Sequence, residues 1–265
     1  MPHPRVLIFG GNGRIARSMT SLMLARSWDV ISIIRNAEQK AGILQLGEKH
    51  PGTIDVLVSD LEHLKCQDDA KRILDKVRPT CVVFAAGSMS NVYAIDRDAA
   101  KKIIKASTDA PFVTKFLMIS FPASRRRPAP WWDSQDIKMF NEEKSMYPDV
   151  AEAKLQADEY LVAMAKAREV RGGPAFQAIS LRPSWLLTSP PTGKVQLGKT
   201  RSFGQVAIGD VAAVAVSLLS RDDATGWFDL LRGSDEIEEA VDKVIRDKIN
   251  CIEGEDLDRM YRLAD

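Results

Sequence analysis

Three glycines follow an apolar run near the amino terminus and suggest a phosphate-binding turn. The chain reads VLIFGGNGRIARS from Val6 to Ser18. Between a strand and a helix, such glycines permit a tight turn and a close approach of a dinucleotide diphosphate to bare N–H groups at the start of the helix. We expect Gly10 to make the turn and Gly13 to admit the diphosphate, while Asn12, Arg14 and Ile15 lie beside it. The alternative is a glycine-rich turn without a ligand.

The end of the next apolar run bears on which dinucleotide would bind. This run, DVISII, is followed by Arg35 and Asn36, where an acidic residue would favour NAD by binding the adenosine ribose. A guanidinium instead offers a planar partner to a 2′-phosphate. We expect NADP(H), with NAD(H) as the less favoured cofactor and Arg35 and Asn36 as its contacts. Alternatively, Arg35 is an ordinary surface residue.

Two further segments follow directly after strands, at the same expected edge of the sheet. Asp60 and Leu61 follow the third strand, where the carboxylate can meet the adenine amino group and the leucine can cover the ring. Ala85, Ala86 and Gly87 follow the fourth strand, and their small size lets the backbone pass close to the cofactor. A simple turn aspartate is the alternative for Asp60.

The elements that must position these residues alternate between strands and helices. Strands are expected at 5–9, 29–34, 53–59, 80–86, 114–121, 176–181 and 226–231, and helices at 15–27, 64–77, 94–106, 150–170, 209–220 and 234–249. This alternation predicts an α/β fold, a Rossmann-type doubly wound parallel sheet. We expect a single NAD(P)-binding domain over 1–265, with a cofactor half at about 1–120 and a small C-terminal substrate lobe from 121–148 and 183–232.

Two inserts interrupt this pattern and are expected to be loops at the ligand-binding edge. PASRRRPAPWW spans 122–132, and a second loop-rich insert spans 190–204. We interpret Arg125–Arg127 as a solvated loop face rather than an anion clamp. Trp131 and Trp132 either wall a pocket for a flat substrate or pack inside the lobe.

Composition and charge exclude several classes of protein. The 265 residues carry a net charge of +1, which gives no reason to expect a nucleic-acid partner. Three separated cysteines give neither a disulfide framework nor a metal motif, and we expect no metal site. No apolar run reaches the length of about 18 residues that a membrane span requires. With a strand starting at once and no signal peptide expected, we predict a cytoplasmic protein that binds no membrane.

The sequence resembles the short-chain dehydrogenase/reductase superfamily, and within it the atypical, NmrA-like branch that includes flavin and biliverdin reductases. The resemblance covers nearly the whole chain. It is carried by VLIFGGNGRIA, IIRN, SDL, AAG and MIS, and more specifically by EAKLQADEYL, LRPSWL and the TGKVQLG…GDVAAV pattern.

In the typical family a serine, a tyrosine and a lysine four residues later form the catalytic set, with the tyrosine protonating the carbonyl oxygen. The resemblance implies that Ser120 and Lys154 are the catalytic serine and lysine, with Lys154 also holding the nicotinamide ribose. It places Pro183 beside the nicotinamide. The expected tyrosine position holds Val150. Tyr147 precedes Pro148, which we expect to start the helix, so Tyr147 should lie in a loop and is the weaker substitute.

These residues lead to two functional hypotheses. The first is an NADPH-dependent reductase of a flat conjugated acceptor, such as a flavin, quinone or tetrapyrrole, which takes a hydride directly and a proton from water without a tyrosine acid. The second is a non-catalytic NADP(H) redox-sensing regulator that reports to a protein partner. Sugar-nucleotide isomerase or dehydratase chemistry ranks last, because it normally needs the tyrosine. We expect a monomer or homodimer.

Overall fold

A nine-stranded sheet forms the centre of the computed structural model, which describes residues 3–264. The strand order is β11-β8-β10-β6-β5-β4-β1-β2-β3. From β3 to β10 every neighbouring pair is parallel, and β8 and β11 add antiparallel pairs at one edge. The strands are β1 (Arg5–Phe9), β2 (Asp29–Ile34), β3 (Thr53–Val58), β4 (Cys81–Phe84), β5 (Lys115–Ile119), β6 (Gln177–Pro183), β8 (Lys194–Gly198), β10 (Gly226–Arg232) and β11 (Asp235–Glu236).

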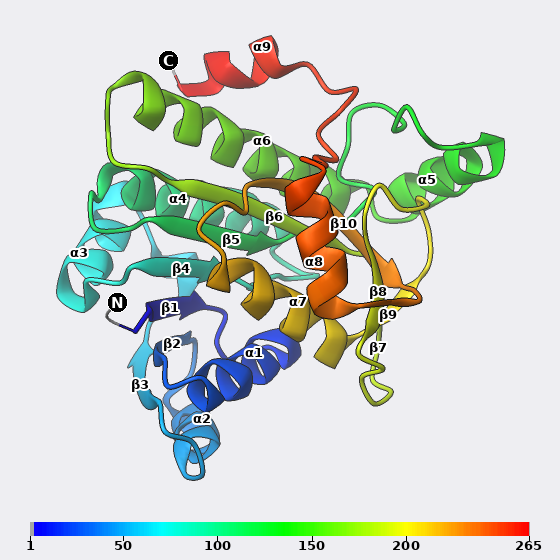
Figure 1. The fold of residues 1–265 in the computed structure, drawn as a ribbon. Helices are drawn as coiled ribbons and strands as arrows, with labels where there is room; N and C mark the ends of the chain where they lie inside the picture. Colours follow the sequence, from blue (N-terminus) through cyan, green and yellow to red (C-terminus); the bar gives the residue numbers. More distant parts are fainter. Residues whose placement is uncertain (1–2, 265) are drawn as a thin grey trace.

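Helices cover both faces of this sheet, which confirms the doubly wound α/β fold (Figure 1). One face packs against α1 (Arg14–Ala25), α7 (Ile208–Ser220) and α8 (Ile237–Arg246). The other packs against α3 (Gln67–Val77), α4 (Ala100–Asp109) and α6 (Pro148–Val170). The short α2 (Lys40–Leu44) lies by β3, and α9 (Leu257–Tyr261) lies along α6. No helix among residues 3–264 is long and apolar enough to cross a membrane.

The first strand lies inside the sheet and is apolar over four of its five residues. Val6, Leu7, Ile8 and Phe9 are completely buried, as expected of a strand covered by helices on both sides. Here β1 lies between β2 and β4. The strands β2 and β3 extend the sheet on one side of β1, and β4, β5 and β6 extend it on the other. Such a switch point opens a crevice at the carboxyl ends of the strands, where ligands of this architecture bind.

The lobe beside this crevice differs in part from the sequence expectation. Residues 122–132 form no regular element, as expected, but α5 (Ser134–Met146) follows them and was not predicted. The expected loop at 190–204 contains β8, which pairs with β10. The two strands are far apart in the sequence, so the local pattern of residues around β8 does not indicate this pairing. A two-stranded parallel sheet of β7 (Trp185–Leu187) and β9 (Gln205–Ala207) completes the lobe.

Candidate nucleotide and substrate site

The glycine turn at the end of β1 has the conformation that the sequence predicted. Gly10 has a φ of 82°, and a Cβ there would lie 2.6 Å from the Cα and N of Ala86. Gly13 is the N-cap of α1, and no side chain caps this helix. Its first turn contains no acidic residue and begins with Arg14. The first amides of α1 therefore face the crevice without a side-chain acceptor from the described part of the chain, as a bound diphosphate would require.

A cavity of about 280 Å³ extends from this turn across the ends of β2 and β3. Most of the residues proposed for cofactor binding line it: Gly10, Asn12, Gly13, Arg35, Asp60, Leu61, Ala85, Ala86 and Gly87. The residues present therefore fit an extended dinucleotide. Ile15 does not line this cavity, because its side chain packs against the core. Asn36 does not line it either, because its side chain caps a 3-10 helix at Ala37–Gln39 by accepting from the Glu38 amide at 3.1 Å.

Arg35 and Asp60 line the same cavity, but only Asp60 already has a hydrogen-bond partner among residues 3–264. The Arg35 side chain is exposed and forms no ion pair or hydrogen bond with any residue between 3 and 264. Its guanidinium therefore has no partner there that a phosphate would have to displace. Asp60 accepts from the Glu62 amide at 3.1 Å and so caps the 3-10 helix at Leu61–His63. This is the geometry of the turn aspartate that the sequence left open.

A second cavity, of about 610 Å³, adjoins the first along Ala85, Ala86 and Gly87. Its other walls come from the ends of β5 and β6, from β7, and from α1, α5 and α6. Apolar and aromatic side chains dominate these walls: Met89, Ile119, Phe121, Tyr147, Val150, Pro183, Trp185 and Leu186. Arg14, Ser120, Glu143, Lys154 and Ser184 add the polar groups. The predicted catalytic residues thus lie beside the predicted nucleotide site, in a cavity with mostly apolar walls.

Lys154 is fixed by a carboxylate that sequence reasoning missed. Its Nζ lies 2.9 Å from Oδ1 of Asp96 and donates to the carbonyl of Ile119 at 3.3 Å. Asp96 is buried in a π-helical segment, Tyr93–Ala99, that precedes α4, and its Oδ2 accepts from the Ser88 amide at 2.9 Å. This pair sets the ammonium against the floor of the larger cavity.

Ser120 is present at the cavity, but its hydroxyl proton is directed elsewhere. Its Oγ donates to Oδ2 of Asp158 at 2.5 Å, and Asp158 also accepts from Ser180 and Arg182 at 2.6 Å each. Complete burial raises the pKa of Asp158, while the nearby Arg182 guanidinium and the two hydroxyl donors oppose this shift. Ser120 is thereby fixed to a buried network beneath the site and has no free proton to orient a substrate.

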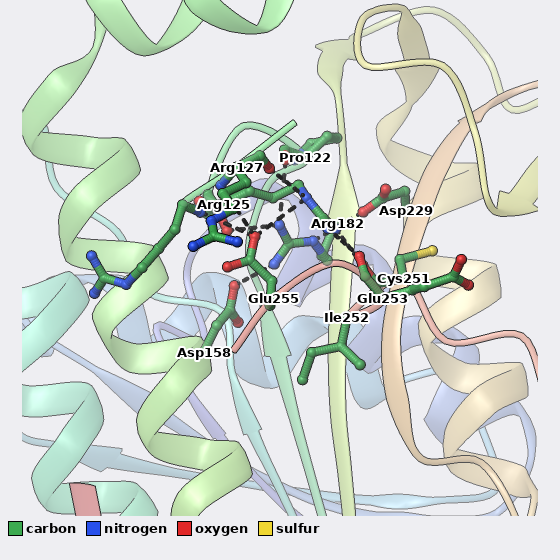
Figure 2. Close-up of polar contacts among 12 residues, drawn as sticks. Pro122, Arg125, Arg127, Asp158, Arg182, Asp229, Cys251, Ile252, Glu253 and Glu255 are labelled. Carbon is green, nitrogen blue, oxygen red and sulfur yellow. Dashed lines mark hydrogen bonds and ion pairs between the residues drawn. The ribbon is translucent and has the colours of Figure 1, made fainter. Parts of the chain in front are cut away.

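The network beneath the site overturns one expectation about the arginine run (Figure 2). Arg182 bridges Asp158 and Asp229, with its Nε 2.9 Å from the latter carboxylate. Arg125 is completely buried rather than solvated, and its guanidinium donates to the backbone carbonyls of Cys251 and Glu253 instead of to water. Arg126 and Arg127 do have exposed side chains. The arginine that was expected on a solvated face therefore fastens the C-terminal segment to the 122–132 loop.

The two tryptophans of this loop belong to the lobe interior. Both indole N–H groups donate to the carbonyl of Thr200, at 2.8 Å from Trp131 and 3.0 Å from Trp132. Trp132 is buried against Phe140 of α5. The aromatic side chains of the cavity are instead Phe121, Tyr147 and Trp185. Tyr147 lies at the junction of α5 and α6 before Pro148, and the centroid of its ring is 5.7 Å from that of Trp185. No group of three or more metal-ligating side chains occurs between residues 3 and 264.

Comparison with known proteins supports this description of the fold. A putative NAD-dependent epimerase/dehydratase from Bacillus halodurans aligns with a TM-score of 0.70 and 23% identity, covering 91% of this chain and 99% of that one. ChuY, an anaerobilin reductase from Escherichia coli O157:H7, aligns with a TM-score of 0.65 and 18% identity over 86% and 97% of the two chains. The yeast methylglyoxal/isovaleraldehyde reductase Gre2, solved with NADPH, aligns with a TM-score of 0.60 and 15% identity, covering 84% of this chain and 76% of that one.

Comparison with curated proteins gives no match. The family comparison does: the model described as NAD(P)H-binding matches residues 10–222, from the glycine turn to the end of α7. This match agrees with the bare amides of α1 and the cavity at the switch point. This match confirms the expected NAD(P)H-binding character, and the structural neighbours share the fold. The chain belongs to the NAD(P)H-binding family.

Proposed function

We propose that this protein is an NADPH-dependent reductase of a flat, conjugated acceptor of the flavin, quinone or tetrapyrrole type. The observation that carries the proposal is the pair of adjoining cavities, which meet at Ala85–Gly87. One fits a dinucleotide, and the other has aromatic walls with Lys154 but a valine where a tyrosine acid would stand. A simple ketone would develop an alkoxide there without a tyrosine to protonate it. A conjugated acceptor spreads the developing charge over its rings.

In this proposal the residues of the chain bind and orient. The amides at the start of α1 hold the diphosphate, and Arg35 favours the 2′-phosphate of NADPH over the free hydroxyl of NADH. Lys154, held by Asp96, contacts the ribose next to the nicotinamide, and Pro183 packs beside that ring. When bound, the nucleotide supplies the hydride. Phe121 and Trp185 hold the acceptor in the larger cavity, so that proximity provides most of the rate.

An acceptor panel tests this proposal. Purified protein and NADPH are offered flavins, quinones, linear tetrapyrroles and simple ketones, and oxidation of NADPH is followed by absorbance. We expect turnover with one of the conjugated classes, with little effect of Tyr147→Phe. Turnover of simple ketones that survives Tyr147→Phe would overturn the choice of acceptor.

A second function, NADP(H) sensing without catalysis, is favoured by one observation. Both members of the expected catalytic pair already have partners in the fold: Ser120 donates to Asp158, and Lys154 pairs with Asp96. A regulator would bind NADPH in calorimetry but oxidise it with no acceptor of the panel. The same two measurements therefore separate the two functions.

A further inference from the structure

A buried carboxyl group in the larger cavity has no role in the function proposed so far. Glu143 of α5 lines this cavity and is 4% exposed. Its Oε1 accepts from the indole N–H of Trp185 at 2.6 Å. Its Oε2 is inaccessible to water and has no hydrogen-bond partner among residues 3–264. An ionised carboxylate would leave one charged oxygen unpaired in this position, which is costly in a buried site.

No charged group between residues 3 and 264 forms an ion pair with Glu143. Lys154 lines the same cavity, but its ammonium is paired with Asp96. On α5 itself, Lys144 is directed to the backbone carbonyl of Arg125 at 2.6 Å. Arg14 and Tyr147 contribute to the cavity from α1 and from the α5–α6 junction. Burial raises the pKa of Glu143 above its ordinary value of 4.5, and the hydrogen bond from Trp185 only partly opposes this shift.

We propose that Glu143 is held as a carboxylic acid and donates a proton to the acceptor, in place of the tyrosine hydroxyl that is absent at position 150. The inference rests on the proposed reductase function. In the step, the acceptor gains a hydride, with its two electrons, at carbon from NADPH, and a proton from the Glu143 carboxyl at a conjugated heteroatom. NADP⁺ and a Glu143 carboxylate remain, and the carboxylate regains a proton from water.

The geometry supports donation rather than a fastening role alone. The terminal torsion of a glutamate is broad, so rotation of the carboxyl group can bring the oxygen without a partner toward the cavity. A protonated Oε2 is a hydrogen-bond donor for which the described chain supplies no acceptor, and a bound acceptor molecule can supply one. The competing role is structural, because the bond between Glu143 and Trp185 joins α5 to β7.

The variant Glu143→Gln separates these roles. Its amide oxygen can still accept from Trp185, but it has no acidic proton to give. With the acceptor that the wild type reduces fastest, we expect kcat to fall about 100-fold, the low end for loss of a general acid, with KM for NADPH unchanged. We also expect kcat of the wild type to fall as pH rises and Glu143 loses its proton, and this fall should be absent in Glu143→Gln. The matched control is Glu142→Gln, whose side chain is exposed on the same helix and pairs with Lys138.

A measurement without substrate tests the protonation itself. A carboxyl group with a raised pKa binds more protons folded than unfolded, so the free energy of unfolding must fall as pH rises from its ordinary pKa through its folded pKa. Denaturant unfolding from pH 4 to 8 should show this decline in the wild type and in Glu142→Gln but less of it in Glu143→Gln. An identical decline in all three, or unchanged kcat and pH profile in Glu143→Gln, would overturn the role of Glu143 alone. If the wild type reduces no acceptor, the proposed function fails and the donor role fails with it.

Discussion

The ion pair between Lys154 and Asp96 offers the sharpest test of how the site is built. Asp96 is 2% exposed and its carboxylate lies 2.9 Å from the ammonium. The change Asp96→Asn keeps the shape and can still accept from the Ser88 amide, but it removes the charge that Lys154 faces. Removing one partner of a buried pair costs about 3–5 kcal/mol. Lys154 keeps its bond to Ile119 and is 15% exposed, so we expect the low end, about 3 kcal/mol.

A double-mutant cycle measures the pair directly. The free energy of unfolding is obtained from guanidinium titrations of wild type, Asp96→Asn, Lys154→Met and the double variant. We expect the double variant to be more stable than the sum of the single losses predicts, with a coupling energy above about 1 kcal/mol, because it leaves no charge unpaired. Single variants within about 0.5 kcal/mol of wild type, or losses that simply add, would refute the argument that Asp96 fixes Lys154.

Three further changes test the nucleotide site and its support. Arg35→Gln should weaken NADPH binding about tenfold in calorimetry, the low end for an exposed charge-assisted contact, and leave NADH unchanged, with exposed Lys40→Gln as the control. Gly10→Ala should lower Tm and abolish nucleotide binding, because its Cβ would collide with Ala86. Gly172→Ala is the control: its φ is 70° but the space around it is open, so it should show only the conformational cost of about 1–2 kcal/mol. Arg125→Met should cost about 3 kcal/mol, because Glu255 and two carbonyls lose their donor, and proteolysis should then cut the segment after residue 250 first.

Much of the fold was predictable because its signals are local. The buried strand Val6–Phe9 is an unbroken apolar run, and Gly10 at its end reports the positive φ that the turn requires. By contrast, α5 follows a proline-rich loop and has only a weakly amphipathic sequence, SQDIKMFNEEKSM. The strand β8 is short and takes its register from β10, more than 30 residues later in the chain. Local pattern carries little information about such pairings.

The candidate site divides in the same way. Its nucleotide half lies in strand-to-helix turns, where residue type and spacing are informative, and the residues predicted there mostly line one cavity. Its substrate half depends on contacts that are distant in sequence. Asp96 meets Lys154 from another helix, and Trp185 reaches Glu143 from a strand 42 residues away. Arg125 could not be recognised as buried, because its partners are backbone carbonyls, which carry no sequence signal.

Because of these contacts, we expect residues of the lobe, rather than the serine at the end of β5, to contact the acceptor. By the resemblance, the serine after β5 would orient the substrate. Here the Ser120 hydroxyl instead donates its hydrogen bond to Asp158, which is itself part of the buried network with Arg182. A group so fixed serves the framework. The lobe lines the same cavity with Tyr147, Trp185 and Glu143, which come from the α5–α6 junction, β7 and α5. If the lobe determines the acceptor, substitutions at Trp185 should change the order of preference among acceptors while leaving NADPH affinity unchanged, and Ser120→Ala should affect stability more than acceptor choice.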